Sequence, residues 1–291
     1  MDPTRTLPPH LIDIVKQYVD GSVPAAEPRA ASTVVLLRDG DGRPGGLEVY
    51  LLRRHVAMEF AAGTSVFPGG GVDVRDAELA ESLWGGPTPE EWASRMGCTP
   101  VEAKELVCAA VRETFEESGV LLAGTADTVV ADTTGEEWEA DRAALESRAL
   151  SLTDLLRRRG LVLRTDLLAV LGGWLTPTFE PKRFRTWFFV AALPGGQATR
   201  DVSTESDRVA WMPLRTAISL VDSGDMLMLP PTYATCCELY DALTPAEAMA
   251  HAASVPHEMI EPVVDIATST LVIPDRIVQL GIRVGEAVHA S

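Results

Sequence analysis

Three glutamates in one short segment have the clearest chemical potential in this chain. Glu113, Glu116 and Glu117 are spaced i, i+3, i+4, so a helix would direct all three carboxylates to one side. Like charges set so closely repel each other, and a divalent cation among them would offset that repulsion. Clustered oxygen ligands select Mg²⁺ or Mn²⁺ over metals that prefer sulfur. A solvated acidic helix face is an alternative that the spacing fits equally well.

The residues around the glutamates favour a helix with two distinct sides. At 100° per residue, Val107, Cys108, Val111 and Phe115 gather on one side and the glutamates lie roughly opposite. Gly119 follows directly, as expected of a glycine that ends a helix in the left-handed conformation. The sequence therefore predicts a helix that buries its apolar side and presents the three glutamates to a cleft.

A second segment, residues 66–73, has the sequence Val-Phe-Pro-Gly-Gly-Gly-Val-Asp. Three glycines after a proline allow backbone conformations closed to other residues, and they let backbone groups approach a ligand closely. Taken alone, such a segment is typical of a turn.

Together the two segments resemble the signature of the Nudix hydrolase family, G-x5-E-x7-R-E-U-x-E-E-x-G-U, where U is a bulky apolar residue. Residues 67–70 resemble its opening and residues 112–120 its second half. The separation exceeds the usual spacing, so residues 74–106 are interpreted as an insertion inside the signature. Thr114 stands where a bulky apolar residue is usual. Counting back from Arg112, Lys104 stands at the isolated upstream glutamate, with Glu102 or Glu105 as substitutes.

The insertion makes the chain similar to a subgroup that resembles the mammalian peroxisomal coenzyme A diphosphohydrolase. Five segments look like that subgroup, and the resemblance covers residues 32–239. The segments are residues 51–54, 63–70, 173–177, 183–189 and 229–232.

The resemblance implies an α/β fold, namely a Nudix α/β/α sandwich around a mixed β-sheet with added helical regions. It also implies metal-dependent hydrolysis of a diphosphate linkage. Glu116 and Glu117 would bind Mg²⁺ or Mn²⁺, with Glu113 as a third ligand or as the base. The Gly70 carbonyl would also reach the metal.

Two further catalytic roles are implied. Arg112 would orient a neighbouring carboxylate through a bidentate pair. The alternative general base is Glu205, on a later loop; a surface glutamate without that role is the simpler interpretation. Arginines near the signature are expected to bind the phosphates of a substrate, and they are Arg53, Arg54, Arg183 and Arg185.

Composition fits a globular enzyme of 291 residues, 46% of them hydrophobic. The formal charge of −17 argues against nucleic acid as a partner, although bound cations would still allow an anionic substrate. No stretch is long and apolar enough to span a bilayer, and the N-terminus lacks an apolar signal core. The four cysteines form no CxxC pair. We expect a reduced, cytoplasmic chain. A homodimer is compatible with the sequence.

The chain is expected to divide into an N-terminal arm (1–30), a Nudix domain (31–240) and a C-terminal helical extension (241–291). Helical insertions are expected near 74–106 and 136–160. The remaining predicted elements are strands at 32–38, 47–53, 167–171 and 185–193, a possible strand at 270–273, and helices at 11–18, 214–223, 232–243 and 245–253.

Three functions follow for comparison. The first is a diphosphatase acting on coenzyme A or acyl-coenzyme A, releasing 3′,5′-ADP and a phosphopantetheine product. The second is a Nudix hydrolase for ADP-ribose, NADH or a nucleoside triphosphate. The third is a non-catalytic Nudix-like nucleotide sensor. The presence of all three glutamates and Arg112 favours catalysis.

Overall fold

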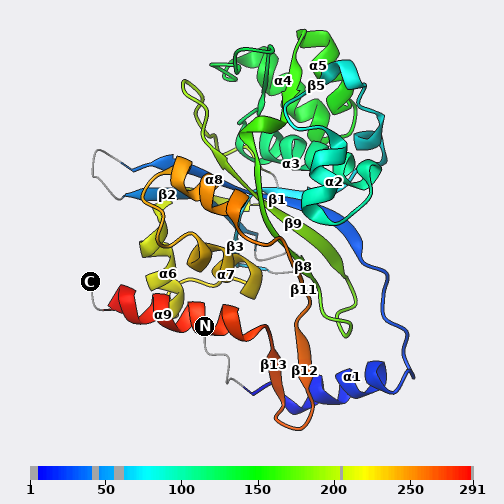
Figure 1. Ribbon diagram of the computed structural model, residues 1–291, viewed down its shortest axis with the longest axis vertical. Helices are drawn as coiled ribbons and strands as arrows, with labels where there is room; N and C mark the ends of the chain where they lie inside the picture. Colours follow the sequence, from blue (N-terminus) through cyan, green and yellow to red (C-terminus); the bar gives the residue numbers. More distant parts are fainter. Residues whose placement is uncertain (1–5, 41–45, 56–61, 204–205, 290–291) are drawn as a thin grey trace.

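The computed structural model describes residues 6–40, 46–55, 62–203 and 206–289 (Figure 1). Its main sheet has the strand order β10–β2–β1–β9–β8–β11, with β3 paired to β2 and β4 to β1. The pairs β1–β9 and β8–β11 are parallel and the others antiparallel, so the sheet is mixed, as predicted. The strands are β1 (Arg29–Asp39), β2 (Leu47–Arg54), β3 (Ser65–Val66), β4 (Gly69–Gly71), β8 (Ala169–Leu175), β9 (Phe184–Ala192), β10 (Ser206–Pro213) and β11 (Met259–Ile260).

Side chains that alternate along β1 build two separate hydrophobic cores, one on each face of the sheet. Val34 and Leu36 belong to the first core, whereas Val35 and Leu37 belong to the second. One face is covered by the region of α2 (Pro89–Met96), α3 (Pro100–Ser118), α4 (Glu136–Glu146) and α5 (Leu152–Arg159). The other is covered by α6 (Leu214–Asp222), α7 (Pro230–Glu238), α8 (Pro245–Ser254) and α9 (Asp275–His289). The predicted α/β/α sandwich is therefore confirmed (Figure 1).

The glutamate-bearing segment forms the long helix α3. The Thr99 side chain caps its first turn by accepting a hydrogen bond from the Glu102 backbone, and Gly119 ends it with φ 74°. Val107, Val111 and Phe115 are fully buried, as their spacing predicts. The apolar side of α3 thus fixes the orientation of the opposite side, where the glutamates lie.

Both predicted insertions are largely helical. Residues 74–106 contain the 3-10 helices η1 (Val74–Glu78) and η2 (Glu81–Leu83), the strand β5 (Trp84–Gly85), α2 and the start of α3. Residues 136–160 contain α4 and α5. A small sheet of order β5–β7–β6 ties the two insertions together, with β6 (Ala123–Gly124), β7 (Val162–Arg164) and the adjoining 3-10 helix η3 (Thr165–Leu167).

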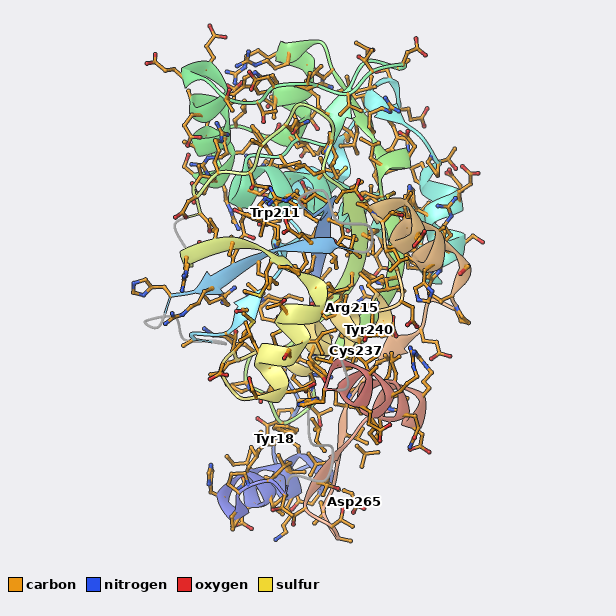
Figure 2. The ribbon with its side chains drawn as sticks, turned by 90° about the vertical axis from the view of Figure 1, so that its left-hand side faces the viewer. Tyr18, Trp211, Arg215, Cys237, Tyr240 and Asp265 are labelled. Atoms are coloured by element: carbon orange, nitrogen blue, oxygen red, sulfur yellow. The ribbon has the colours of Figure 1, made fainter. Side chains whose placement is uncertain are left out.

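The N-terminal arm lies beside part of the C-terminal region. The helix α1 (Pro9–Val19) lies near the hairpin of β12 (Val263–Asp265) and β13 (Thr270–Val272), and Figure 2 places Tyr18 and Asp265 at this same end. The Leu7 backbone N–H donates to the Ser269 carbonyl at 2.7 Å. The region after residue 240 therefore contains strands as well as helices, and one of them, β11, belongs to the main sheet.

Two expectations drawn from composition can be compared with the described residues. All four cysteines are free thiols, and Cys108, Cys236 and Cys237 are buried. Across the described ranges, no helix has the length and apolar character that crossing a membrane requires.

Candidate active site

The glycine segment and α3 are brought together by β1. β4 pairs with β1 so that Gly70 lies opposite Ser32, and the buried Ser32 hydroxyl donates to the Leu106 carbonyl of α3 at 2.6 Å. The helix consequently passes close to β4. In this way β1 brings together the glycine segment and α3, the two parts of the Nudix-like signature that the insertion separates in the sequence.

The contacts between β4 and the glutamates are direct. The Gly69 backbone N–H donates to Glu117 Oε2 at 2.8 Å. A Cβ added to Gly70 would lie 2.5 Å from the Glu113 carboxyl carbon, so a side chain at this position would displace Glu113. Glycine at position 70 thus allows the Glu113 carboxylate to approach the backbone of β4 closely.

Arg112 lies at the centre of the acidic cluster and is buried. Its Nη1 donates to Glu113 at 2.7 Å and to Glu116 at 3.2 Å. Its Nε and Nη2 each lie 3.1 Å from an oxygen of Asp76, and Nη2 also donates to the Gly71 carbonyl at 2.8 Å. One guanidinium therefore positions three carboxylates and the backbone of β4.

The burial of these groups decides between the two interpretations of the glutamates. The side chains of Glu113 and Glu116 are only 14% and 10% exposed, so the alternative of a solvated acidic face is wrong. That all three glutamates face a cleft stays a prediction, and Glu116 is the more enclosed of these two. Arg112, one turn before it, holds its carboxylate inward.

Asp76 is a site residue that the sequence analysis missed. It is 3% exposed, and it accepts a hydrogen bond from the Asp73 backbone N–H at 2.9 Å in addition to its pair with Arg112. Counted forward from Gly70, Asp76 has the G-x5-E spacing of the family signature, with Asp in place of Glu.

Counting back from Arg112 across the insertion leads to Lys104 instead. The ion pair of Asp76 with Arg112 favours Asp76 for this position, with the insertion starting after it. Glu102, one of the suggested substitutes, instead pairs with Arg185.

The electrostatics of the cluster follow from its burial. Burial, and then the charge of Glu113, raise the pKa of Glu116 to about 7, whereas Arg112 acts in the opposite direction. Burial likewise raises the pKa of Asp76 against the effect of Arg112. Keeping Asp76, Glu113 and Glu116 all ionised costs free energy when Arg112 is the cation that they share. An additional positive charge would therefore stabilise their ionised forms.

The donors present fit a hard divalent cation in kind. They are carboxylate oxygens beside a glycine backbone, and the Gly70 position is a cradle that a Cβ would fill. Among the described residues, no three His, Cys, Asp or Glu side chains are arranged closely enough to hold a metal ion. Arg112 and the Gly69 N–H hold the three glutamates in their present positions.

The remaining predicted site residues lie in different surroundings. Arg53 and Arg54 end β2 in the β2–β3 hairpin that leads into the glycine segment, where Arg53 pairs with Ser65. Arg185 contacts Glu102 in the first turn of α3. Glu205 lies outside the described residues.

Arg183 is buried, with its guanidinium bound to the Thr176 and Ala26 carbonyls and to Glu261. These contacts tie the N-terminal arm and the C-terminal region to the start of β9. The substrate-binding role of Arg183 stays a prediction.

A mixed sheet between helical layers, with a carboxylate-bearing helix set against a glycine strand, defines the Nudix class of hydrolases. The chain belongs to the Nudix hydrolase family. The family model described as the NUDT19 Nudix domain matches residues 87–239, which include α3. A solved Nudix hydrolase from Alicyclobacillus acidocaldarius is 30% identical, with a TM-score of 0.66 over 77% of this chain and 96% of that one.

Curated relatives are more distant. The chain is 25% identical over 208 residues to the putative nudix hydrolase 7 of Caenorhabditis elegans, covering 70% of this chain but 57% of that protein. It is 27% identical over 261 residues to the acyl-coenzyme A diphosphatase NUDT19 of Gallus gallus, covering 72% of this chain and 68% of that protein. The chain thus spans little more than half the length of the first of these relatives.

Proposed function

We propose that this protein is a metal-dependent diphosphohydrolase that cleaves the diphosphate linkage of coenzyme A or acyl-coenzyme A. The products would be 3′,5′-ADP and a phosphopantetheine or acyl-phosphopantetheine. The observation that carries the proposal is the meeting of the α3 glutamates with the glycine strand around Arg112. The substrate class rests on the likeness to the acyl-coenzyme A diphosphatase of Gallus gallus.

The proposed metal ligands are Glu116, Glu117, Glu113 and the Gly70 carbonyl, with Mg²⁺ or Mn²⁺ as the ion. When bound, such an ion neutralises diphosphate oxygens and acidifies a water molecule. The residues of this chain supply the rest. Arg112 and Asp76 hold the carboxylates in position, and the backbone of β4 fixes the distance between the glutamates and the sheet.

Proton abstraction from water is assigned to Glu113 or to Glu205. Glu113 is supported by its position beside Gly70. For Glu205, the support is the loop before it, where the Arg200 N–H donates to the Ser118 carbonyl at the end of α3 and the Tyr50 hydroxyl donates to the Arg200 carbonyl. The loop that leads toward residue 205 therefore lies beside the C-terminus of α3.

Phosphate binding is assigned to arginines near the glycine strand. Arg53 and Arg54 are the strongest candidates. They end β2, which pairs with β3, and β3 leads directly into the glycine segment that contains Gly70. Arg185 would have to leave its pair with Glu102, and Arg183 its three internal partners, in order to bind an anion. We expect the first pair to contribute more to KM than the second.

The four free thiols suit the cytoplasm, the compartment we propose.

A panel of diphosphate compounds separates the candidate substrates. Coenzyme A, an acyl-coenzyme A, ADP-ribose, NADH and a nucleoside triphosphate would be incubated with the protein and Mg²⁺ or Mn²⁺, and the products identified by mass. We expect 3′,5′-ADP from the coenzyme A compounds at the highest kcat/KM. Equal, feeble rates on coenzyme A and ADP-ribose would remove the coenzyme A preference, and higher rates on another compound would reassign the substrate.

The carboxylate assignment has its own test. Glu116→Gln combined with Glu117→Gln should lower turnover of the best substrate by about a hundredfold or more, because charge stabilisation in the transition state is lost. Glu286→Gln on the exposed face of α9 is the matched control and should leave turnover unchanged. Turnover of the double variant within tenfold of the parent would show that the assignment is wrong.

A further inference from the structure

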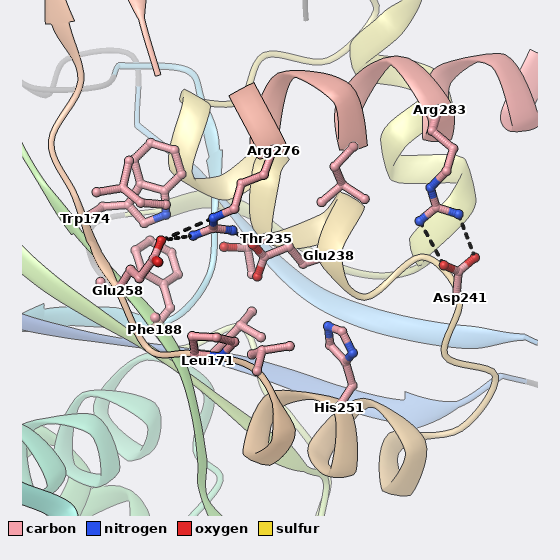
Figure 3. A pocket seen from close by; sticks show the side chains of 16 residues that line it. Leu171, Trp174, Phe188, Thr235, Glu238, Asp241, His251, Glu258, Arg276 and Arg283 are labelled. Atoms are coloured by element: carbon pink, nitrogen blue, oxygen red, sulfur yellow. Dashed lines mark hydrogen bonds and ion pairs between the residues drawn. The ribbon is translucent and has the colours of Figure 1, made fainter. Parts of the chain in front are cut away.

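A cavity of about 300 Å³ lies on the face of the main sheet opposite α3. Its floor is formed by Leu171, Trp174 and Phe188 of β8 and β9, which belong to the second core. Residues of α7, α8 and α9 form its walls (Figure 3). The sheet separates this cavity from the first core, in which α3 packs, so the proposed hydrolytic site does not account for it.

The inner wall carries hydrogen-bond acceptors. Thr235 and Glu238 lie one turn apart on α7, and His251 faces them from α8 with its ring directed into the cavity (Figure 3). Among the described residues, Arg276 is the one hydrogen-bond partner of the Glu238 side chain, at a long 3.3 Å, and the His251 ring has none. A hydroxyl and a carboxylate can each accept a hydrogen bond, and so can an imidazole nitrogen when the ring is neutral.

The rim carries two ion pairs exposed to solvent. Arg276 lies 2.9 Å from Glu258, and Arg283 lies 2.8 Å from Asp241. Each guanidinium therefore already has a carboxylate partner, and an anionic ligand would have to displace it. The described lining residues include three carboxylates, those of Glu238, Asp241 and Glu258, and two guanidinium groups.

Glu238 differs from the rim carboxylates by its burial, with a side chain 18% exposed. Burial raises the pKa of Glu238, while Arg276 acts in the opposite direction and Glu258 adds to the increase. Arg276 lies closer to Glu258 than to Glu238, so the cation nearest to Glu238 is shared. A buried acid in this position gains from a further positive charge.

We propose that this cavity is a second ligand site, which binds a small organic ammonium compound with an aromatic or aliphatic body. The three donors of a primary ammonium group match the acceptors of Thr235, Glu238 and His251. The apolar body would lie on Trp174 and Phe188, whose aromatic faces also attract cations.

The site is shared between the family-matched part of the chain and the residues beyond it. Trp174, Phe188 and Glu238 lie within the match at residues 87–239, whereas His251 and Arg276 lie after it. β11 and α9 bring the later residues back over the sheet, because β11 pairs with β8 beside Trp174. The site stands independently of the proposed hydrolysis.

The test uses three compounds of similar shape and different charge. 2-Phenylethylamine is the cation, 2-phenylethanol the neutral analogue and phenylacetate the anion, each titrated calorimetrically into the full chain at pH 7. We expect saturable one-to-one binding of the amine, about tenfold or more tighter than binding of the alcohol, since the alcohol has no positive charge and one O–H donor instead of three N–H donors. Phenylacetate should bind more weakly than either.

Variants locate the binding. Glu238→Gln should reduce the affinity for the amine to that for the alcohol, whereas Glu286→Gln on the exposed side of α9 should leave it unchanged. His251→Ala, at a partly exposed position, should weaken amine binding severalfold and serves if Glu238→Gln does not fold. The amine should also raise the Tm of the parent and of Glu286→Gln.

Several results would overturn the proposal. They are equal affinity for the amine and the alcohol, tighter binding of phenylacetate, no binding of any of the three, or amine binding unaffected by both Glu238→Gln and His251→Ala. None of these outcomes touches the assignment of Glu116 and Glu117, which rests on turnover.

Discussion

The two faces of the main sheet differ in how far their charged side chains are buried. On the α3 face, Arg112, Asp76 and Glu116 are buried, and the Arg112 guanidinium donates hydrogen bonds to both carboxylates. On the other face, the ion pairs of Arg276 and Arg283 are exposed at the rim of a cavity. A buried charge that loses its partner is left unpaired in a medium of low dielectric constant, whereas an exposed one is resolvated. We therefore expect the loss of an ionic partner to cost more on the α3 face than on the opposite face.

The largest expected difference between the faces is in stability. Asp76→Ala should lower the free energy of unfolding by about 3–5 kcal/mol, because it leaves Arg112 buried without its bidentate partner. Asp241→Ala breaks the exposed pair with Arg283 and should cost at most about 1 kcal/mol. Urea unfolding of both variants measures the contrast. Similar losses in the two variants would show that the faces do not differ in this respect.

Glycine substitutions sharpen the same contrast. An alanine Cβ at Gly70 would lie 2.5 Å from the Glu113 carboxyl carbon, whereas at Gly172 its nearest neighbour, the Glu258 carbonyl oxygen, lies at 3.5 Å. Gly70→Ala should cost about 1–3 kcal/mol of stability and at least about tenfold in turnover, since it moves the Glu113 carboxylate that we propose to be catalytic. Gly172→Ala should change stability by less than about 1 kcal/mol. Full activity in Gly70→Ala would argue against a fixed position for Glu113.

The pH dependence of the α3 face is set partly by Asp73. The hydrogen bond from Arg75 lowers the pKa of Asp73, so its ionised form stabilises the folded state above the unfolded pKa of about 4. That stabilisation is lost as the pH falls toward the folded pKa. Asp73→Asn, which keeps a capping side chain, should cost about 1 kcal/mol at pH 7, and the difference should shrink between pH 5 and pH 3. Thermal unfolding across this range measures it, and a difference independent of pH would contradict the assignment.

The smallest effect is expected where the chain departs from the family signature. Thr114 is fully buried, and its hydroxyl donates to the Ala110 carbonyl of the preceding turn at 2.7 Å. Thr114→Val removes a hydroxyl that bonds only to the backbone of its own helix, and such bonds add little to helix stability. Stability should therefore change by less than about 1 kcal/mol and turnover by less than about twofold. A Tm comparison with the parent checks this. A large loss would mean that the hydroxyl has a role of its own in the site.

Local patterns explain why much of the fold was predictable. The apolar spacing of Val107, Val111 and Phe115 and the terminating Gly119 predict α3, because a helix presents residues three and four apart on one side. Runs rich in strand-forming residues predicted β1 and β2, and mixed charge predicted α4 and α5, within a few residues of their bounds. The α/β/α arrangement followed from the resemblance to the Nudix family, which the comparisons confirm.

Other features lay beyond the reach of local patterns. Asp76 lies 36 residues before Arg112, and counting back across an insertion of unknown length leads to Lys104 instead. The burial of Glu116 depends on the same arginine and on the pairing of β4 with β1. The cavity is formed by α7, α8, β11 and α9, whose meeting over the sheet leaves no periodic signal in the sequence.

The sequence by itself determined which elements form and which residues could bind a metal, because helix and strand periodicity and carboxylate chemistry are properties of neighbouring residues. Only the tertiary structure decided which charges share a site. Long-range pairing brought Asp76 and Gly70 to Arg112 and carried Arg276 back over Glu238. Burial then fixed the consequence, because a charge removed from water depends on the partners that the fold places beside it.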